Sequence, residues 1–182
     1  MSRAYKFHKP DGLYFITFAT VNWVDVFTRR DYKDIIVESL RFCQKEKGLM
    51  LFAWVIMSNH VHLIAQAAEG FRLQDIMRDL KKYTSKQITK AIREHPGESR
   101  REWMLKLFRE AGQRNSNNQD FQFWQQHNKP IELVTNAMIG RYVKYLHNNP
   151  VKEGYVEFAE DYLYCSAPVI AGKPGLLKLE GL

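Results

Sequence analysis

Two histidines separated by one residue are the part of the sequence best suited to chemistry. His60 and His62 follow the apolar run 49–57 after only Ser58 and Asn59. Residues i and i+2 of a strand point to the same face, whereas on a helix they lie about 200° apart. On a strand the two imidazoles would therefore lie side by side, as a pair of metal ligands does. Two histidines that simply pack in a sheet give the same pattern, and for an isolated pair that interpretation is the commoner one.

A second group lies near the C-terminus on a predicted helix. Thr135 can cap this helix, and Pro150 is expected to end it, because the residue before a proline is driven out of the helical region. At about 100° per residue, Tyr145 and Asn149 lie one turn apart on one flank, and Tyr142 lies about one turn earlier. A phenol and a carboxamide would therefore project side by side.

The elements that must position these groups follow from the hydrophobic pattern. Alternating and β-branched runs predict strands, a 3.6-residue period predicts helices, and the two residues between the second and third strands predict a tight hairpin. The resulting order of strand, helix, strand, strand, helix, strand matches the β-α-β-β-α-β unit of ferredoxin-like folds. We expect an α+β protein with an antiparallel sheet, helices packed on one face and a C-terminal helix that carries Tyr145. The predicted strands are 13–21, 49–57, 60–66, 121–124 and 130–134, and the predicted helices are 31–47, 71–93, 98–111 and 135–149.

Size and composition predict one domain with a nucleic-acid partner. A chain of 182 residues with 45% hydrophobic content can bury a full core, which we place at about residues 12–150, with a C-terminal extension over 151–182. The net charge of +7 favours a polyanionic partner. Cys43 and Cys165 fit neither a zinc site nor a disulfide framework. With no apolar stretch near the ~20 residues that span a bilayer, we expect no membrane partner and a cytoplasmic location.

Basic residues on two predicted helices are the candidates for contact with DNA phosphates. The segment 71–93 holds seven Lys and Arg residues against Asp75 and Asp79. Charged helix faces are most often merely solvated, but one of nearly a single sign is a better candidate for phosphate contact. Trp124 is open to two interpretations, since it could stack a base or fill the core. The residues predicted to bind DNA are Arg78, Lys81, Lys82, Lys86, Arg141 and Lys144.

The combined motifs resemble a known family. The segment MSNHVHLI, the basic helix after it, and the segments KYLHNNPVKEGYV and DYLYCSA are similar to the single-tyrosine HUH transposases, in which U is an apolar residue. The similarity is greatest to their REP-associated tyrosine transposase branch and extends over about residues 14–167. The histidine pair alone is weakly specific, but its combination with Y-x-x-N-N-P-V-K is specific. Ser58 replaces the proline of many relatives, which could loosen the turn, and Cys165 replaces a common serine.

The resemblance implies an activity and a role for each residue. It implies a transposase that nicks and joins single-stranded hairpin or palindromic repeat DNA through a 5′-phosphotyrosine, with Tyr145 as the nucleophile. It also implies that His60, His62 and Asn149 bind a divalent metal. Imidazole nitrogens, an amide oxygen and phosphate oxygens suit Mg²⁺ or Mn²⁺. Tyr142 is the rival nucleophile. Tyr145 could instead be a core tyrosine, and Asn149 could merely cap a helix end.

Three other functions are compared with this interpretation. An RNA-recognition module of ferredoxin-like fold should carry an RNP-type aromatic motif, and the sequence has none. A metal-dependent hydrolase needs a third firm ligand and a general base, yet the nearest acid after the histidines is Glu69. A domesticated family member that binds palindromic repeats with little or no cleavage remains open. The sequence also leaves open the target DNA, the physiological metal, and whether a monomer or a homodimer forms the site.

Overall fold

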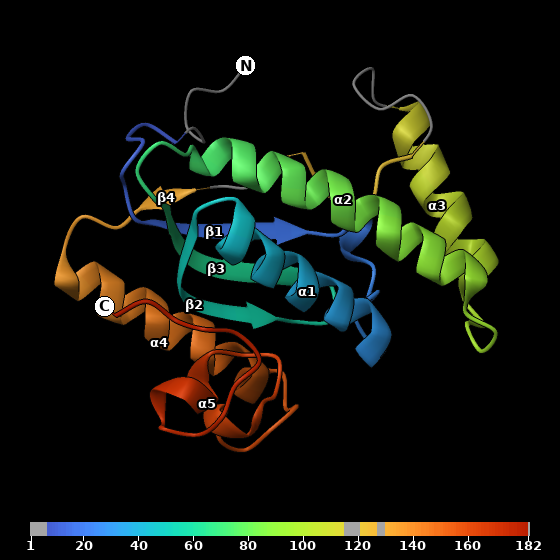
Figure 1. The fold of residues 1–182 in the computed structure, drawn as a ribbon. Helices are drawn as coiled ribbons and strands as arrows, with labels where there is room; N and C mark the ends of the chain where they lie inside the picture. The colour runs from blue at the N-terminus through green and yellow to red at the C-terminus, as the bar shows by residue number, and fades with distance from the viewer. Residues whose placement is uncertain (1–6, 115–120, 127–129, 182) are drawn as a thin grey trace.

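The computed structural model describes residues 7–114, 121–126 and 130–181. A four-stranded antiparallel sheet with the strand order β2-β3-β1-β4 lies at its centre (Figure 1). This order and the intervening helices confirm the predicted ferredoxin-like α+β fold. The hairpin between β2 and β3 is also confirmed. The strands are β1 (Tyr14–Ala19), β2 (Leu49–Ile56), β3 (His60–Ala67) and β4 (Ile131–Glu132).

Two long helices cover one face of this sheet. Helices α1 and α2 pack against each other on this face, and α3 follows α2 after a loop in which the chain changes direction (Figure 1). The predicted helices agree with these within three residues at each end, whereas the strand predicted at 121–124 is reduced to a single bridge between Trp124 and Thr20. The helical elements are η2 (Val21–Trp23), α1 (Arg30–Glu46), α2 (Leu73–Glu94), α3 (Arg101–Gln113), α4 (Asn136–Lys152), η3 (Ala159–Asp161) and α5 (Ala167–Ile170).

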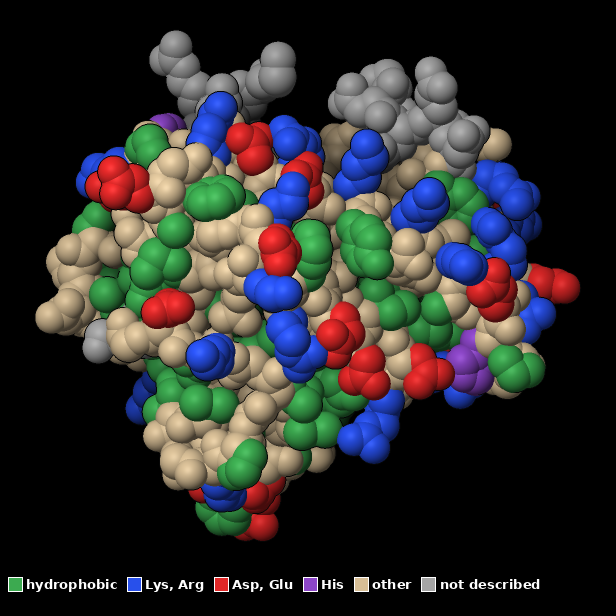
Figure 2. Space-filling view, viewed as in Figure 1, with side chains coloured by type: hydrophobic (Ala, Val, Ile, Leu, Met, Phe, Trp, Pro, Cys, Tyr) green, Lys and Arg blue, Asp and Glu red, His purple; other side chains and the backbone are tan. Residues whose placement is uncertain are grey.

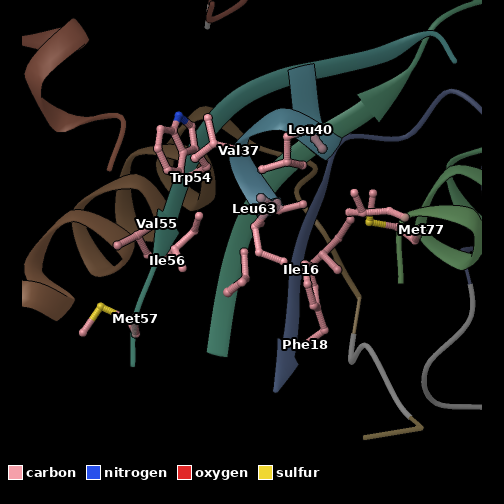
Figure 3. Close-up of a cluster of buried hydrophobic side chains, with 14 of the residues drawn as sticks. Ile16, Phe18, Val37, Leu40, Trp54, Val55, Ile56, Met57, Leu63 and Met77 are labelled. Atoms are coloured by element: carbon pink, nitrogen blue, oxygen red, sulfur yellow. The ribbon is translucent and has the colours of Figure 1, made fainter. Parts of the chain in front are cut away.

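Alternation along the strands divides the sheet into two faces with different surroundings. Ile16 and Phe18 of β1 and Leu63 of β3 point toward α1 and α2, where they meet Leu40 and Met77 in a fully buried cluster (Figure 3). The intervening residues of the same strands must point the other way, because successive side chains of a strand alternate. That second face carries the histidine pair and is covered by α4, which contacts β2 and β3.

Helix α4 begins as predicted but does not end as predicted. The hydroxyl of Thr135 accepts a hydrogen bond from the backbone N–H of Met138 at 3.2 Å, which confirms the cap. Pro150 does not end the helix, which continues to Lys152. Pro150 lacks the N–H that would donate to the carbonyl of Leu146 and disfavours the helical conformation of Asn149, but the helix runs only two residues beyond it. Pro150 is buried there, so its packing offsets the cost.

The segment after α4 returns to cover the exposed edge of β2. The carbonyl of Trp54 accepts a hydrogen bond from the N–H of Ser166 at 2.9 Å, and the N–H of Ile56 donates to the carbonyl of Tyr164 at 2.9 Å. Cys165 lies between these two and forms a bridge with Val55. An uncovered edge strand is a site of unwanted pairing between chains, and this segment protects it.

Two further expectations concern cysteines and membranes. Cys43 and Cys165 are both buried and free, which confirms that they form no disulfide. In the described ranges, no helix is both long enough and apolar enough to cross a bilayer.

Candidate active site

The histidine pair occupies neighbouring positions on the face of β3 that α4 covers. His62 lies opposite Thr17 of β1 and Val55 of β2. The ring centroids of His60 and His62 are 4.6 Å apart, so the side-by-side arrangement predicted from their spacing is confirmed. His62 is buried, with 4% of its surface exposed, and His60 is half-buried.

Hydrogen bonds to each Nδ1 leave both Nε2 atoms available. The Nδ1 of His60 lies 2.7 Å from the side-chain oxygen of Asn59, which only accepts, so this nitrogen carries the proton. The Nδ1 of His62 lies 2.7 Å from the hydroxyl oxygen of Thr17. The Nε2 of His60 therefore presents a lone pair, and so does the Nε2 of His62 in the tautomer whose Nδ1 donates to Thr17. The Nε2 of His62 is buried and has no hydrogen-bond partner, a costly state that a bound cation would relieve.

Burial keeps both imidazoles neutral near pH 7. Desolvation lowers the pKa of His60 to about 4. Burial, together with the neighbouring His60, lowers the pKa of His62 to about 3. A buried imidazolium would lose its hydration, which is why the neutral form is favoured. Because metal ions bind neutral imidazole, both side chains are in the protonation state that a metal site needs.

Tyr145 of α4 lies beside this pair. Its ring centroid is 5.6 Å from that of His62 and 5.9 Å from that of Phe15, and 46% of its surface is exposed. Tyr142 is less exposed: its ring packs on Phe15 at 4.6 Å, with the guanidinium of Arg141 over it at 5.3 Å. Of the two tyrosines, Tyr145 thus combines contact with a histidine and access from solvent.

These groups share one cavity of about 620 Å³ between the sheet and α4. Its wall is aromatic and amphipathic, and it brings together residues that are widely separated along the chain. Such a concave site with a few convergent polar groups is suited to hold a ligand. The cavity is lined by Phe15, Thr17, Ala19, Trp23, His60, His62, Gln125, Ile131, Arg141, Tyr142, Tyr145 and Asn149.

Asn149 is positioned by the helix that carries Tyr145. Its side-chain nitrogen donates to the backbone carbonyl of Tyr145 at 2.8 Å, one turn earlier. In the part of the chain that the structure describes, no group of three or more His, Cys, Asp or Glu side chains could hold a metal. Of the residues that line the cavity, the two imidazoles and the Asn149 amide oxygen are of the types that could bind a divalent cation.

The predicted DNA-binding residues divide between two faces of the molecule. Arg141 lines the cavity, and Lys144 is exposed on the same helix. Arg78, Lys81, Lys82 and Lys86 all belong to α2, which packs on the opposite face of the sheet. The structure therefore places Arg141 and Lys144 on the helix of the tyrosine, whereas the α2 residues lie across the sheet, from where Lys81 reaches the cavity wall at Gln125.

Two of the α2 residues already have partners. The guanidinium of Arg78 contacts Asp75 at 2.7 Å and Asp79 at 3.0 Å. The ammonium of Lys81 donates to the carbonyl of Gln125 at 2.8 Å, and burial lowers its pKa to about 8. Figure 2 shows Lys and Arg interspersed with Asp and Glu over the face that carries α1 and α2. This face is thus not of a single sign, and the exposed residues left for phosphate contact are Lys82 and Lys86.

Trp124 belongs to the core and not to the cavity. Only 6% of its surface is exposed, and its indole N–H donates to the hydroxyl of Thr84 at 3.0 Å. A different tryptophan, Trp23, lines the cavity with 53% of its surface exposed, and the sequence predicted no role for it. The sequence also did not indicate the contact of Thr17 with His62. No local pattern indicates either residue, because each depends on contacts between segments distant in sequence.

Comparisons with known proteins indicate the family and the fold of the chain. A family model described as "Transposase IS200 like" matches residues 11–119, a range that includes both histidines and ends before Tyr145. No curated protein matches the chain. Among solved structures, it is similar to a REP-associated tyrosine transposase bound to a REP hairpin, with a TM-score of 0.66 and 18% identity, over 100% of this chain and 93% of that chain. A candidate transposase from Deinococcus radiodurans R1 is 19% identical over 81% of this chain and 97% of that chain, with a TM-score of 0.46.

Proposed function

The chain belongs to the IS200-like transposase family, and we propose that it nicks and rejoins single-stranded DNA with Tyr145 as the nucleophile. The observation that carries this proposal is the position of Tyr145. Its partly exposed ring lies 5.6 Å from the ring of His62, in a cavity that also holds His60 and Asn149. The family match itself does not reach Tyr145, so this choice of nucleophile depends on the geometry.

The proposed reaction consists of two transesterifications. The phenol oxygen of Tyr145 attacks a DNA phosphorus and loses its proton, while the bond to the 3′ oxygen breaks. The products are a 5′-phosphotyrosine and a free 3′-OH. In the second step another 3′-OH attacks the same phosphorus and releases the tyrosine, which splits one difficult displacement into two easier ones without water.

His60, His62 and Asn149 are proposed to hold Mg²⁺ or Mn²⁺. When bound, such a cation polarises a non-bridging phosphate oxygen and stabilises the charge on the departing 3′ oxygen. The residues of the chain have separate tasks. Phe15 and His62 fix the position of the Tyr145 ring, and Arg141 offers a guanidinium to a phosphate at the cavity wall.

The proposed substrate is a DNA hairpin or palindromic repeat with single-stranded flanks. The similar protein with a TM-score of 0.66 is bound to a REP hairpin. The net charge of +7 suits a polyanion. Since one chain supplies the tyrosine and both histidines to the same cavity, we propose that Tyr145 acts on DNA held by its own chain.

A covalent trapping experiment tests the proposal. The full chain is incubated with Mn²⁺ and a labelled pool of DNA hairpins whose single-stranded flanks have random sequence, and adducts that resist SDS are separated on a gel. We expect an adduct with the wild-type protein, its loss in Tyr145→Phe, and its retention in Tyr142→Phe, a matched control from the same helix and cavity. Loss in Tyr142→Phe alone would refute the assignment. The absence of any adduct would refute the strand-transfer activity.

A further inference from the structure

Trp23 is a large apolar side chain held in the open at the mouth of the cavity. Its indole is 53% exposed and lies 5.8 Å from the ring of His60, measured between centroids. At a concave site, an exposed indole offers a flat apolar face to a ligand. The other exposed tryptophan, Trp103 on α3, does not line this cavity.

The backbone at this position is strained. Asn22 and Trp23 have φ values of 53° and 55°, in the left-handed region. Asparagine tolerates this region, but for a bulky residue such as tryptophan it is an outlier. Strained backbone persists only where the surrounding structure holds it, and such residues cluster at functional sites. Other segments must therefore hold this backbone in place, and the strain indicates that Trp23 has a function.

The restraint comes from a local turn and from two segments distant in sequence, around Phe123 and Asn59. The N–H of Val21 donates to the carbonyl of Phe123 at 2.7 Å, and the N–H of Trp23 donates to the carbonyl of Thr20 at 3.1 Å. The side-chain nitrogen of Asn59 donates to the carbonyl of Trp23 at 3.3 Å. The side-chain oxygen of Asn59 is bonded to the Nδ1 of His60. The orientation of His60 and the position of the Trp23 backbone are thus fixed by the same amide.

We propose that the Trp23 indole stacks on one unpaired base of the DNA strand in the cavity and thereby positions the neighbouring phosphate beside His60 and Tyr145. This inference rests on the proposed function, because it needs a single-stranded substrate. Every base has a π face, so an exposed indole accepts an unpaired base of any identity, whereas a paired base is already stacked in its duplex. Trp23 is therefore a positioning residue that favours single-stranded flanks over continuous duplex.

Affinity measurements test the inference. All proteins carry Tyr145→Phe, so that no covalent adduct forms, and Mn²⁺ is present. The probe is one labelled hairpin oligonucleotide selected from the pool by binding. We expect Trp23→Ala to raise the dissociation constant about 10-fold and Trp23→Phe, which keeps a stacking ring, to restore most of the affinity. Trp103→Ala, which removes an indole with the same exposure, is the matched control and should bind like its parent.

Abasic substitutions identify the stacked base. Each unpaired nucleotide of the probe is replaced in turn by an abasic one. At one position the loss of affinity should equal that caused by Trp23→Ala. The abasic substitution and Trp23→Ala together should then reduce the affinity no more than either change alone. The inference is overturned if Trp23→Ala binds like Trp103→Ala, or if the two losses multiply at every position.

Fluorescence gives a second readout if Trp23→Ala does not fold. In Trp103→Phe the exposed indole is that of Trp23, since Trp54 and Trp124 are buried. Its emission should be quenched by the probe, whereas Trp23→Phe should show no such quenching, and equal quenching in both would contradict stacking. Covalent trapping does not depend on these results. If the protein forms the adduct but both tests of Trp23 fail, only this inference is wrong. If the protein binds no probe, both proposals are wrong.

Discussion

Replacement of Thr17 by valine should weaken metal binding without touching either proposed imidazole ligand. The hydroxyl of Thr17 lies 2.7 Å from the Nδ1 of His62, across the β1–β3 pair. Valine has the same branched shape and an equal preference for strands, so β1 should form as before. What is lost is the oxygen that would accept the Nδ1 proton when the Nε2 of His62 binds a metal. In the variant, a metal-bound His62 would bury an unsatisfied Nδ1–H. Alternatively, the proton would stay on Nε2, and that nitrogen would then have no lone pair for a metal.

The size of the effect follows from this contact. Partners that fix the tautomer of a metal-binding histidine typically change metal affinity by 10- to 100-fold when removed. Because the burial of His62 leaves no solvent to take over the bond, we expect the dissociation constant for Mn²⁺ to rise by about 10- to 100-fold in Thr17→Val. At saturating Mn²⁺ this corresponds to a loss of about 1.4 to 2.7 kcal/mol of metal-dependent stabilisation of the fold.

Calorimetric titration with Mn²⁺ measures the affinity, and the increase in melting temperature on addition of Mn²⁺ measures the stabilisation. Thr17→Ser is the matched control, since it keeps the hydroxyl and should retain most of the affinity. Equal Mn²⁺ affinity in Thr17→Val and the wild-type protein would refute the reasoning that this hydroxyl fixes the His62 tautomer. Loss of affinity in both variants would point to a packing effect and not to the hydrogen bond.

Two further predictions concern stability. Burial alone would raise the pKa of Glu98, but hydrogen bonds from Arg100 and Arg29 outweigh it and lower the pKa to about 2. A carboxyl whose pKa is depressed on folding stabilises the fold at a pH above its unfolded pKa, here near 4.5. This contribution, about 3 kcal/mol, is lost as the pH falls toward 2. Urea unfolding of Glu98→Gln should show lower stability at neutral pH and a weaker acid dependence than wild type, and an unchanged acid dependence would contradict this. Thr135→Ala should cost about 1 kcal/mol in thermal unfolding because it removes the α4 cap, while Thr135→Ser should not, and equal losses would exclude the cap as the cause.

The parts of the fold that the sequence predicted well are those decided by local patterns. The hairpin of β2 and β3 follows from two apolar runs with a short connection, and the side-by-side histidines follow from the two-residue period of a strand. The end of α4 was predicted wrongly because the local rule for Pro150 ignores burial, and this proline packs in the core. The strand predicted at 121–124 is reduced to one bridge between Trp124 and Thr20, because the N–H of Gln122 donates to the carbonyl of Phe108 on α3 instead of continuing a ladder along β1.

The candidate site was predictable only in part, because partners and faces are set by tertiary structure. The basic residues of α2 are visible in the sequence, but their place across the sheet from Tyr145 is not. Nor does the sequence show that Arg78 is paired with two aspartates, or that Lys81 reaches the carbonyl of Gln125. Contact of Lys82 and Lys86 with DNA stays a prediction.

Asn59 shows how one residue serves both the fold and the proposed chemistry. As a turn residue it closes the hairpin, and its carbonyl accepts hydrogen bonds from the N–H and hydroxyl of Thr20 at the end of β1. Its amide also holds the carbonyl of Trp23 and the carboxylate of Asp25, which in turn accepts a hydrogen bond from Ser58 at 2.6 Å. Ser58 thus takes part in the hydrogen bonds that hold this turn. Because the same amide accepts a hydrogen bond from the Nδ1 of His60, this turn sets both the orientation of a proposed metal ligand and the position of the strained Trp23.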